Sequence, residues 1–274
     1  MKELFNILES MLSETELIRV SNILNKKYRT SRFFRGWSVL DEVLFTPLNI
    51  DINDYESKYN FRDVFSSIIM KYSRNETVIK YHLSQLYIDN EDETMLFEYS
   101  ASNSRVDFAR VNGYSYAYEI KTELDSLDRI KQQTQDYMKI FEYITVVTHI
   151  KHITKLRKEI SRNVGIVSYE FLDGTVIFNE IRSPKYNKGF QKKEIISNLT
   201  SEEMKLVIET FMPRKAPQYK EDRKRLIDRS FSKAELNVAF KSILKMTRQN
   251  KWEYIKNNID TFPPIDIQSY YTNS

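Results

Sequence analysis

The stretch from residue 94 to residue 148 constrains the fold of this chain more than any other part of its sequence. Three strand-like runs come first, a helical period follows, and a short β-branched run closes the stretch. These segments are Thr94–Ala101, Arg105–Val111, Tyr114–Glu123, Ser126–Glu142 and Tyr143–Thr148. Consecutive strands pair as hairpins, whereas a strand–helix–strand connection places its two strands in parallel. The sequence therefore predicts an α/β fold with a three-strand antiparallel meander, a helix and a parallel strand.

The flanks of this stretch are expected to be mainly helical. Ser13–Glu16 and Ser73–Glu76 each have the spacing of a capping box, and the second is expected to open a helix that runs to about Ile88. A helix over residues 154–162 and a second hairpin from residues 164–171 and 175–182 follow the parallel strand. We therefore expect an N-terminal helical region over residues 1–70, a core over residues 71–183, and a basic, mainly helical region over residues 184–274.

Composition excludes several classes of protein. The chain has no cysteine, which rules out disulfides, thiolate zinc sites and a cysteine nucleophile. Its five glycines are scattered, so a P-loop and a dinucleotide fingerprint are absent. The charged N-terminus does not resemble a signal peptide, and no apolar run reaches the ~18 residues of a membrane span. We expect a soluble, cytoplasmic protein that does not contact a membrane.

The net charge of +4 conceals an asymmetry. From Arg182 to Lys256 the chain has 19 Lys and Arg residues against 9 Asp and Glu residues, so the rest of the chain is acidic. A basic segment beside an acidic body indicates a polyanion-binding layer that lines the rim of a site. The alternative is an ordinary solvated helical surface.

Two neighbouring strand-like runs carry charged side chains beside alanines. Glu119 and Lys121 are two residues apart and share a strand face with Ala117, while Asp107 and Ala109 alternate with apolar residues on the preceding run. Carboxylates on adjacent strands can hold a divalent metal through their oxygens. A neighbouring lysine can orient a water molecule and stabilise charge that develops on a phosphate. The alternative is a solvated sheet face, which a sheet covered on both sides disfavours.

These residues resemble the PD-(D/E)XK nuclease superfamily. The match consists of Asp107, eleven intervening residues and Glu119-Ile120-Lys121, in the helix–meander–helix–strand order of that fold. Gln133 and Tyr137 resemble the Q-x-x-x-Y element of its RecB-like branch, and the phrase YEIKTELDSLDRI resembles a little-characterised phage and mobile-element family. The resemblance covers residues 71–182 and implies a restriction-endonuclease-like core. It departs from the pattern at Val106, where a proline often stands.

The resemblance also implies a site. The residues with implied catalytic roles are Asp107, Glu119, Lys121, Glu76, Gln133 and Tyr137. The implied ligands of Mg²⁺ or Mn²⁺ are Asp107, Glu119, Glu76 and the carbonyl of Ile120. Arg105 and Arg129 are the implied nucleic-acid contacts. For Glu76 the alternative is a capping-box role, for Gln133 a plain helix-to-strand hydrogen bond, and for Arg129 a helix ion pair with Asp125.

The function expected from this site is metal-dependent hydrolysis of phosphodiester bonds, with DNA favoured over RNA as the substrate. One alternative is a non-catalytic nucleic-acid-binding or regulatory protein that retains the nuclease fold. A third hypothesis is a component of a phage or defence system that acts with a protein partner.

The hairpin register decides whether the site can form. A two-residue turn at Asn112-Gly113 would place Asp107 opposite Tyr118, on the other sheet face from Glu119. An odd loop length or one bulge keeps the apolar faces together and places Asp107 opposite Ala117 or Glu119. Burial of two apolar faces outweighs local strand preference, so we expect the odd register.

Overall fold

A computed structural model describes residues 1–30, 35–172 and 174–268 of the chain. It forms two compact units. Among the described residues, the first comprises residues 1–83, 171–177 and 258–268, and the second comprises residues 84–170 and 178–257. The boundary therefore falls within a single helix, α6 (Glu76–Gln85), and within the last hairpin of the sheet.

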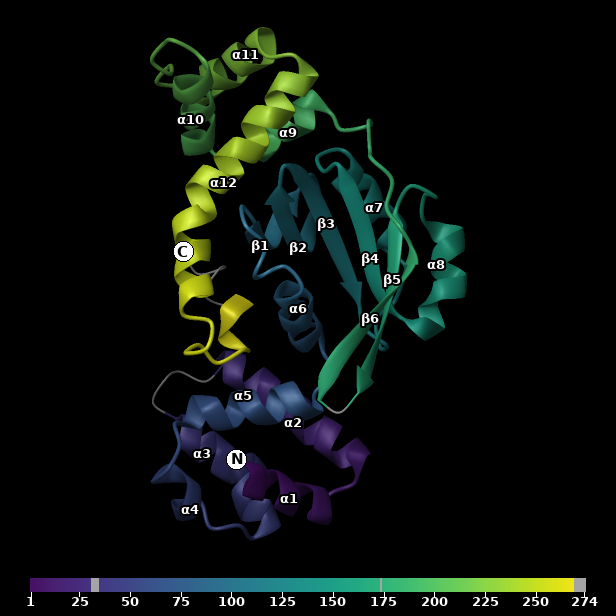
Figure 1. The fold of residues 1–274 in the computed structure, drawn as a ribbon, viewed down its shortest axis with the longest axis vertical. Helices are drawn as coiled ribbons and strands as arrows, with labels where there is room; N and C mark the ends of the chain where they lie inside the picture. The colour runs from purple at the N-terminus through teal and green to yellow at the C-terminus, as the bar shows by residue number, and fades with distance from the viewer. Residues whose placement is uncertain (31–34, 173, 269–274) are drawn as a thin grey trace. The chain divides into compact units, whose positions relative to one another are not determined.

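A six-stranded sheet with the spatial order β1-β2-β3-β4-β5-β6 organises the fold (Figure 1). Its strands are β1 (Thr94–Ala101), β2 (Ser104–Asn112), β3 (Tyr114–Lys121), β4 (Tyr143–His149), β5 (Gly165–Leu172) and β6 (Thr175–Arg182). The pairs β1–β2 and β2–β3 are antiparallel, and the pairs β3–β4 and β4–β5 are parallel. The predicted mixed α/β class and the order of meander, helix and parallel strand are confirmed.

The helices that connect and cover the strands are shorter than the sequence periodicity predicts. Helix α7 (Ile130–Met138) links β3 to β4, and α8 (Ile153–Glu159) links β4 to β5. Residues 122–129 form a turn before α7, because the Asp125 carboxylate accepts hydrogen bonds from the backbone nitrogen and the hydroxyl of Thr122. Such side-chain bonds compete with a helical backbone and delay its start.

The basic C-terminal region supplies most of the remaining helices of the second unit. They are α9 (Lys192–Asn198), α10 (Ser201–Phe211), α11 (Lys220–Ser230) and α12 (Lys233–Asn257). Ile195, Val207, Ile227 and Phe240 from these helices are buried in one apolar cluster with Ile130 of α7. Figure 1 shows α12 running beside β1. The region is therefore mainly helical, and its apolar residues pack in the same core as the sheet.

The first unit is helical apart from the short strand segments that it shares with the last hairpin. Its helices are α1 (Lys2–Met11), α2 (Glu14–Thr30), α3 (Gly36–Leu40), α4 (Asn53–Glu56), α5 (Phe61–Tyr72) and the first two turns of α6. The predicted capping box at Ser13 forms, since Glu16 bonds the Ser13 backbone nitrogen and the Ser13 hydroxyl accepts from the Glu16 backbone. Among the described residues, none of the helices combines the length and the apolar character that crossing a bilayer requires.

The second predicted capping box is wrong. Helix α6 begins at Glu76, and its N-cap side chain is that of Asn75, which accepts a hydrogen bond from the Val78 backbone nitrogen at 3.2 Å. Ser73 instead ends α5, and its hydroxyl donates to Asn22. Asparagine is as good an N-cap as serine, so the local sequence permits either start.

The hairpin between β2 and β3 has the odd register. Asn112 pairs with Tyr114, Ala109 with Ala117, and Phe108 with Tyr118. Gly113 alone forms the turn, with φ of 68°. The regular pairs end at Phe108 and Tyr118, next to Asp107 and Glu119, so the two carboxylates lie at the end of the same ladder. The predicted odd register is confirmed.

Replacement of Gly113 tests this turn. A Cβ at position 113 meets no atom within 4 Å, so the cost of a side chain comes from the positive φ and not from crowding. Gly113→Ala is expected to lower the free energy of unfolding by about 1–2 kcal/mol. Gly113→Asn is expected to cost less, since asparagine tolerates this conformation. Urea unfolding of both variants measures the difference, and equal losses would contradict the assignment of the cost to φ.

Candidate active site

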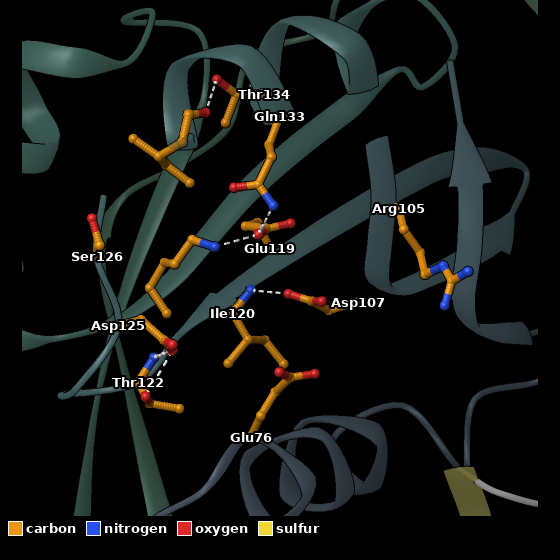
Figure 2. A network of polar contacts seen from close by, with 12 residues as sticks. Glu76, Arg105, Asp107, Glu119, Ile120, Thr122, Asp125, Ser126, Gln133 and Thr134 are labelled. Atoms are coloured by element: carbon orange, nitrogen blue, oxygen red, sulfur yellow. Dashed lines mark hydrogen bonds and ion pairs between the residues drawn. The ribbon is translucent and has the colours of Figure 1, made fainter. Parts of the chain in front are cut away.

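Three carboxylates lie in a row across the first three strands of the sheet. Glu98 of β1 is opposite Asp107 of β2, because Phe97 pairs with Phe108 and Tyr99 with Val106 on either side. Carboxylate oxygens of Glu98 and Asp107 lie within 4.8 Å of each other. Glu119 lies on the neighbouring strand β3, and the backbone nitrogen of the next residue, Ile120, bonds the Asp107 carboxylate. Figure 2 draws Asp107 and Glu119 in this network of polar contacts.

The alternation of the strands is interrupted where this row crosses them. Glu98 has φ of 53°, a left-handed conformation that is uncommon for a non-glycine residue. Leu96 and Tyr99 are three residues apart and yet belong to the same apolar cluster, as do Val106 and Ala109 opposite them. The expected alternation on β2, which would place the apolar residues Val106 and Phe108 together on the face opposite Asp107 and Ala109, is therefore wrong. Glu98 and Asp107 lie at the positions where the alternation of side chains between the two sheet faces is broken.

Glu119 is 1% exposed and is held by three side chains. Its Oε1 accepts from the Lys121 ammonium at 2.7 Å and from the Gln133 amide, and its Oε2 accepts from the Tyr137 hydroxyl. A buried carboxylate without partners would destabilise the fold, so these donors are what makes its burial possible. Gln133 thus makes a helix-to-strand hydrogen bond, and its acceptor is the carboxylate of the predicted site.

Tyr137 links the site to the edge of β2. Its hydroxyl lies 2.6 Å from the Arg105 carbonyl oxygen as well as beside Glu119, and it donates its one proton to one of them at a time. Burial raises the pKa of Tyr137, and the negative charge of Glu119 raises it further. The phenol therefore stays protonated at neutral pH and acts as a hydrogen-bond donor.

Asp107 takes the place of a main-chain acceptor. Regular pairing of β2 with β3 ends at Phe108 and Tyr118, and the Ile120 backbone nitrogen donates instead to Asp107 Oδ2 at 2.7 Å (Figure 2). Ile120 itself is buried, and it continues the parallel pairing of β3 with β4 opposite Val147. The bond fixes the Asp107 carboxylate against the strand that carries Glu119.

Helix α7, which carries Gln133 and Tyr137, is anchored by a buried carboxylate that the sequence analysis missed. Asp136 accepts from the Ser104 hydroxyl at 2.8 Å, from Lys139 at 2.7 Å and from Gln132 at 3.1 Å. Burial alone would raise the pKa of Asp136, but the hydrogen bonds from Lys139, Ser104 and Gln132 outweigh it and hold the pKa below its ordinary value. Ser104 begins β2, so this network fixes the helix against the strand of Asp107.

The two predicted nucleic-acid contacts lie on the surface. The Arg105 side chain is 66% exposed and lies 3.8 Å from the Glu98 carboxylate. Arg129 is exposed at the residue before α7. Within the described part of the chain no ion pair joins Arg129 to Asp125, whose carboxylate bonds Thr122 instead. The helix ion pair between Asp125 and Arg129, the alternative considered for Arg129, is therefore absent from the described residues.

Glu76, the remaining predicted ligand, belongs to the first unit. It is the first residue of α6, and its carboxylate pairs with the Lys80 ammonium one turn further along the helix. Lys80 is 1% exposed, so the pair sets a carboxylate beside a buried positive charge. The capping-box role considered for Glu76 is not the one it has.

The basic region uses part of its charge inside the second unit. Lys241 pairs with the buried Glu142 at 3.0 Å, and Arg248 pairs with the buried Glu203 at 2.7 Å. Arg223 is 9% exposed and donates to the carbonyl oxygens of Ser201 and Pro217. These cations hold helices to one another and to the sheet, so they do not belong to a free polyanion-binding layer.

Glu98 is the residue of the row that the sequence analysis missed. Glu98 lies at a position of its strand-like run where a polar residue is compatible with an ordinary solvent-facing side of the sheet, so its residue type alone does not indicate a site. The only signal is its place opposite Asp107, and that requires the register of β1 with β2. Two carboxylates that lie opposite each other on antiparallel strands repel each other unless a cation or a proton lies nearby.

A mixed α/β protein with a row of carboxylates across its meander is thus the class that the fold defines. Residues 70–264 match the family model of bacteriophage P4 protein cII, and the chain belongs to that family. Protein cII of Enterobacteria phage P4 is 30% identical over 116 residues, which make up 42% of this chain and 44% of the phage protein. The chain therefore matches less than half the length of this relative. The family associates the chain with phages.

A solved structure was also compared. The SPO1766 protein of unknown function from Silicibacter pomeroyi is 14% identical, and the match covers 65% of this chain and 91% of that protein with a TM-score of 0.30. A similarity at this level supports no conclusion about fold or function.

Removal of one hydroxyl tests how Glu119 is held. Tyr137→Phe leaves the ring in place and deprives the buried carboxylate of a donor, so the free energy of unfolding is expected to fall by about 1–3 kcal/mol. Tyr143→Phe is the matched control, because the Tyr143 hydroxyl makes no hydrogen bond among the described residues. Chemical denaturation measures both. Equal stability of Tyr137→Phe and wild type would contradict the network.

Acid titration tests the anchor of α7. A carboxyl whose pKa is lowered on folding stabilises the protein above its unfolded pKa, and this contribution is lost as the pH falls through the folded pKa. Asp136→Asn is therefore expected to lower the free energy of unfolding near neutral pH by about 1–3 kcal/mol. The difference from wild type should shrink from about pH 5 downward. A difference that is independent of pH would contradict this role of the charge.

Proposed function

We propose that this chain is a metal-dependent phosphodiesterase that hydrolyses DNA, with a restriction-endonuclease-like core formed by α6, β1–β4 and α7. The observation that carries the proposal is the hydrogen bond from the Ile120 backbone nitrogen to Asp107, which holds this carboxylate against the strand that carries Glu119, with Lys121 bonded to Glu119. The resemblance to the PD-(D/E)XK superfamily names the same Asp107, Glu119 and Lys121. The family of bacteriophage P4 protein cII supports a phage or mobile-element setting.

The side chains present fit a hard divalent cation. Glu98, Asp107 and Glu119 offer carboxylate oxygens, the donors that Mg²⁺ and Mn²⁺ prefer. The buried Oε1 of Gln133 has no hydrogen-bond partner among the described residues, although the same amide donates to Glu119. A water molecule of a metal's coordination shell beside Glu119 would satisfy this atom. Asp107 and Glu119 would hold the metal, with Glu98 and the carbonyl of Ile120 as further oxygen donors.

Each residue of the network then has a separate task. A bound metal would supply a water molecule of lowered pKa and a positive charge beside the phosphate. Lys121, whose ammonium is anchored on Glu119, is placed to orient the attacking water and to neutralise charge on the phosphate. Gln133 and Tyr137 fix the orientation of Glu119, and the Ile120 backbone nitrogen fixes Asp107. The exposed Arg105 and Arg129 would contact the phosphate backbone without reading sequence.

A non-catalytic nucleic-acid-binding protein with the same fold is the second candidate. One observation favours it: Lys121 and Glu119 neutralise each other within the chain at 2.7 Å. Such an ion pair, with Gln133 and Tyr137 as further donors, is a complete arrangement without a metal. Metal binding and cleavage therefore have to be measured separately.

Cleavage assays with matched variants test the proposal. Wild type is expected to cut linear, circular, single-stranded or double-stranded DNA in Mg²⁺ or Mn²⁺ and to be inactive in EDTA. Asp107→Asn, Glu119→Gln and Lys121→Met are expected to lose about 100-fold or more of the rate while they still bind DNA. Glu123→Gln and Lys131→Met change exposed residues of the same types nearby and should retain activity.

Metal binding distinguishes the two candidates. A thermal shift of wild type with Mn²⁺, absent in Asp107→Asn, is expected for the phosphodiesterase. DNA binding without any metal-dependent shift or cleavage would favour the non-catalytic protein. Equal cleavage by wild type and Asp107→Asn would exclude the proposed mechanism.

A further inference from the structure

Four tyrosines gather at the turn end of β2 and β3. Tyr114 and Tyr116 begin β3, Tyr143 begins β4, and Tyr186 follows β6. The rings of Tyr116 and Tyr143 are stacked, with centroids 5.1 Å apart and planes at 15°. Tyr114 and Tyr186 each meet Tyr143 edge-on, at 5.6 and 5.8 Å, and each other at 6.2 Å. We call these four residues the tyrosine cluster.

The outer rings of the tyrosine cluster remain open to solvent. Tyr114 is 47% exposed and Tyr186 is 40% exposed. The hydroxyls of Tyr114, Tyr143 and Tyr186 make no hydrogen bond among the described residues. Burial raises the pKa of Tyr186, and the charge of Glu142 adds to this effect, so the ring stays neutral at physiological pH. Exposed, neutral aromatic rings held in place by an inner stacked pair form a rigid surface on which planar groups can stack.

Two cations lie against the rings of the tyrosine cluster. The Lys241 ammonium lies 5.4 Å from the centroid of the Tyr114 ring, and the Arg110 guanidinium lies 3.7 Å from that of Tyr116. Each of these cations is paired with a buried carboxylate, Glu142 and Glu93 respectively, so each pair adds little net charge to the surface.

Two further lysines flank Tyr186 in the sequence. Lys185 and Lys188 are exposed, and neither has an ion-pair partner among the described residues. These two lysines add positive charge to the segment that carries Tyr186. A partner that is both polyanionic and aromatic would complement these lysines and the exposed rings, and nucleic acid has these properties.

The tyrosine cluster lies apart from the row of carboxylates. Asp107 is six residues from Gly113 along β2, which corresponds to about 20 Å at the rise of an extended strand. The residues of the cluster take no part in the contacts of Glu119. The tyrosine cluster is therefore a separate surface of the same unit.

We propose that the tyrosine cluster binds single-stranded nucleic acid, with bases stacked on Tyr114 and Tyr186 and phosphates near Lys185 and Lys188. Exposed rings of this kind suit unpaired bases, because the bases of a duplex are stacked on each other and offer no free faces. This inference goes beyond the proposed hydrolysis and does not depend on it, since binding here requires neither a metal nor Asp107.

Fluorescence anisotropy with labelled oligothymidylate in EDTA tests this surface on the full-length chain. The double variant Tyr114→Ala/Tyr186→Ala is expected to bind about tenfold or more weakly than wild type. Tyr114→Phe/Tyr186→Phe should retain wild-type affinity, because stacking requires the ring and not the hydroxyl. Tyr219→Ala/Tyr254→Ala removes two other exposed tyrosines and is the matched control.

Three outcomes would overturn the inference. They are unchanged affinity of Tyr114→Ala/Tyr186→Ala, an equal loss in the Tyr219→Ala/Tyr254→Ala control, and binding of a blunt duplex as tightly as of the single strand. Circular dichroism and thermal melting establish that the alanine variants are folded, and the comparison of single strand with blunt duplex on wild type still tests the inference if they are not. Because the assay contains EDTA, failure of the proposed hydrolysis leaves its result unaffected.

Discussion

The buried carboxylate of Glu119 is the constraint on which the site depends. A carboxylate that is 1% exposed can stay ionised in the interior only if its oxygens are bonded, and here Lys121, Gln133 and Tyr137 bond them. Two of these donors lie on α7, so both bonds form only when the helix packs on β3 at one position along the strand and with one rotation about the helix axis. Asp136 fixes the same helix to the start of β2. Packing of the helix and assembly of the site are therefore the same event.

A second buried carboxylate, that of Glu142, also connects separate elements through its hydrogen bonds, at the other end of β3. Glu142 accepts from the Ser115 backbone nitrogen at 2.7 Å, from Asn237 at 2.7 Å and from Lys241 at 3.0 Å. These contacts join the strand that follows α7 to the helix α12, which is distant in sequence. The acidic core and the basic C-terminal region are thus connected by specific pairs, and only the exposed remainder of the basic residues is available for a polyanion.

The sequence predicted the strands more fully than it predicted the helix boundaries or the residues of the site. The strands follow from alternation and turn residues, and β1 spans Thr94–Ala101 as predicted. Helix starts were less predictable, because Ser73 and Asn75 are both good N-caps and side-chain hydrogen bonds of Asp125 and Ser126 delay the start of α7. Asp107, Glu119 and Lys121 were found because alternation places charged residues among alanines. Glu98 and Asp136 were missed because their partners lie on other strands or other elements.

The odd register at Gly113 and the assignment of Asp107 and Glu119 to adjacent strands were therefore predictable from the local sequence of β2 and β3. The donors around Glu119, the left-handed Glu98 and the tyrosine cluster required the folded chain. The alternation of apolar and polar residues predicts which face of the sheet a residue occupies, because the transfer free energy of each side chain depends on that residue alone. A hydrogen bond or a ring contact depends on two residues whose separation in space is set by packing, and no single strand or helix specifies it.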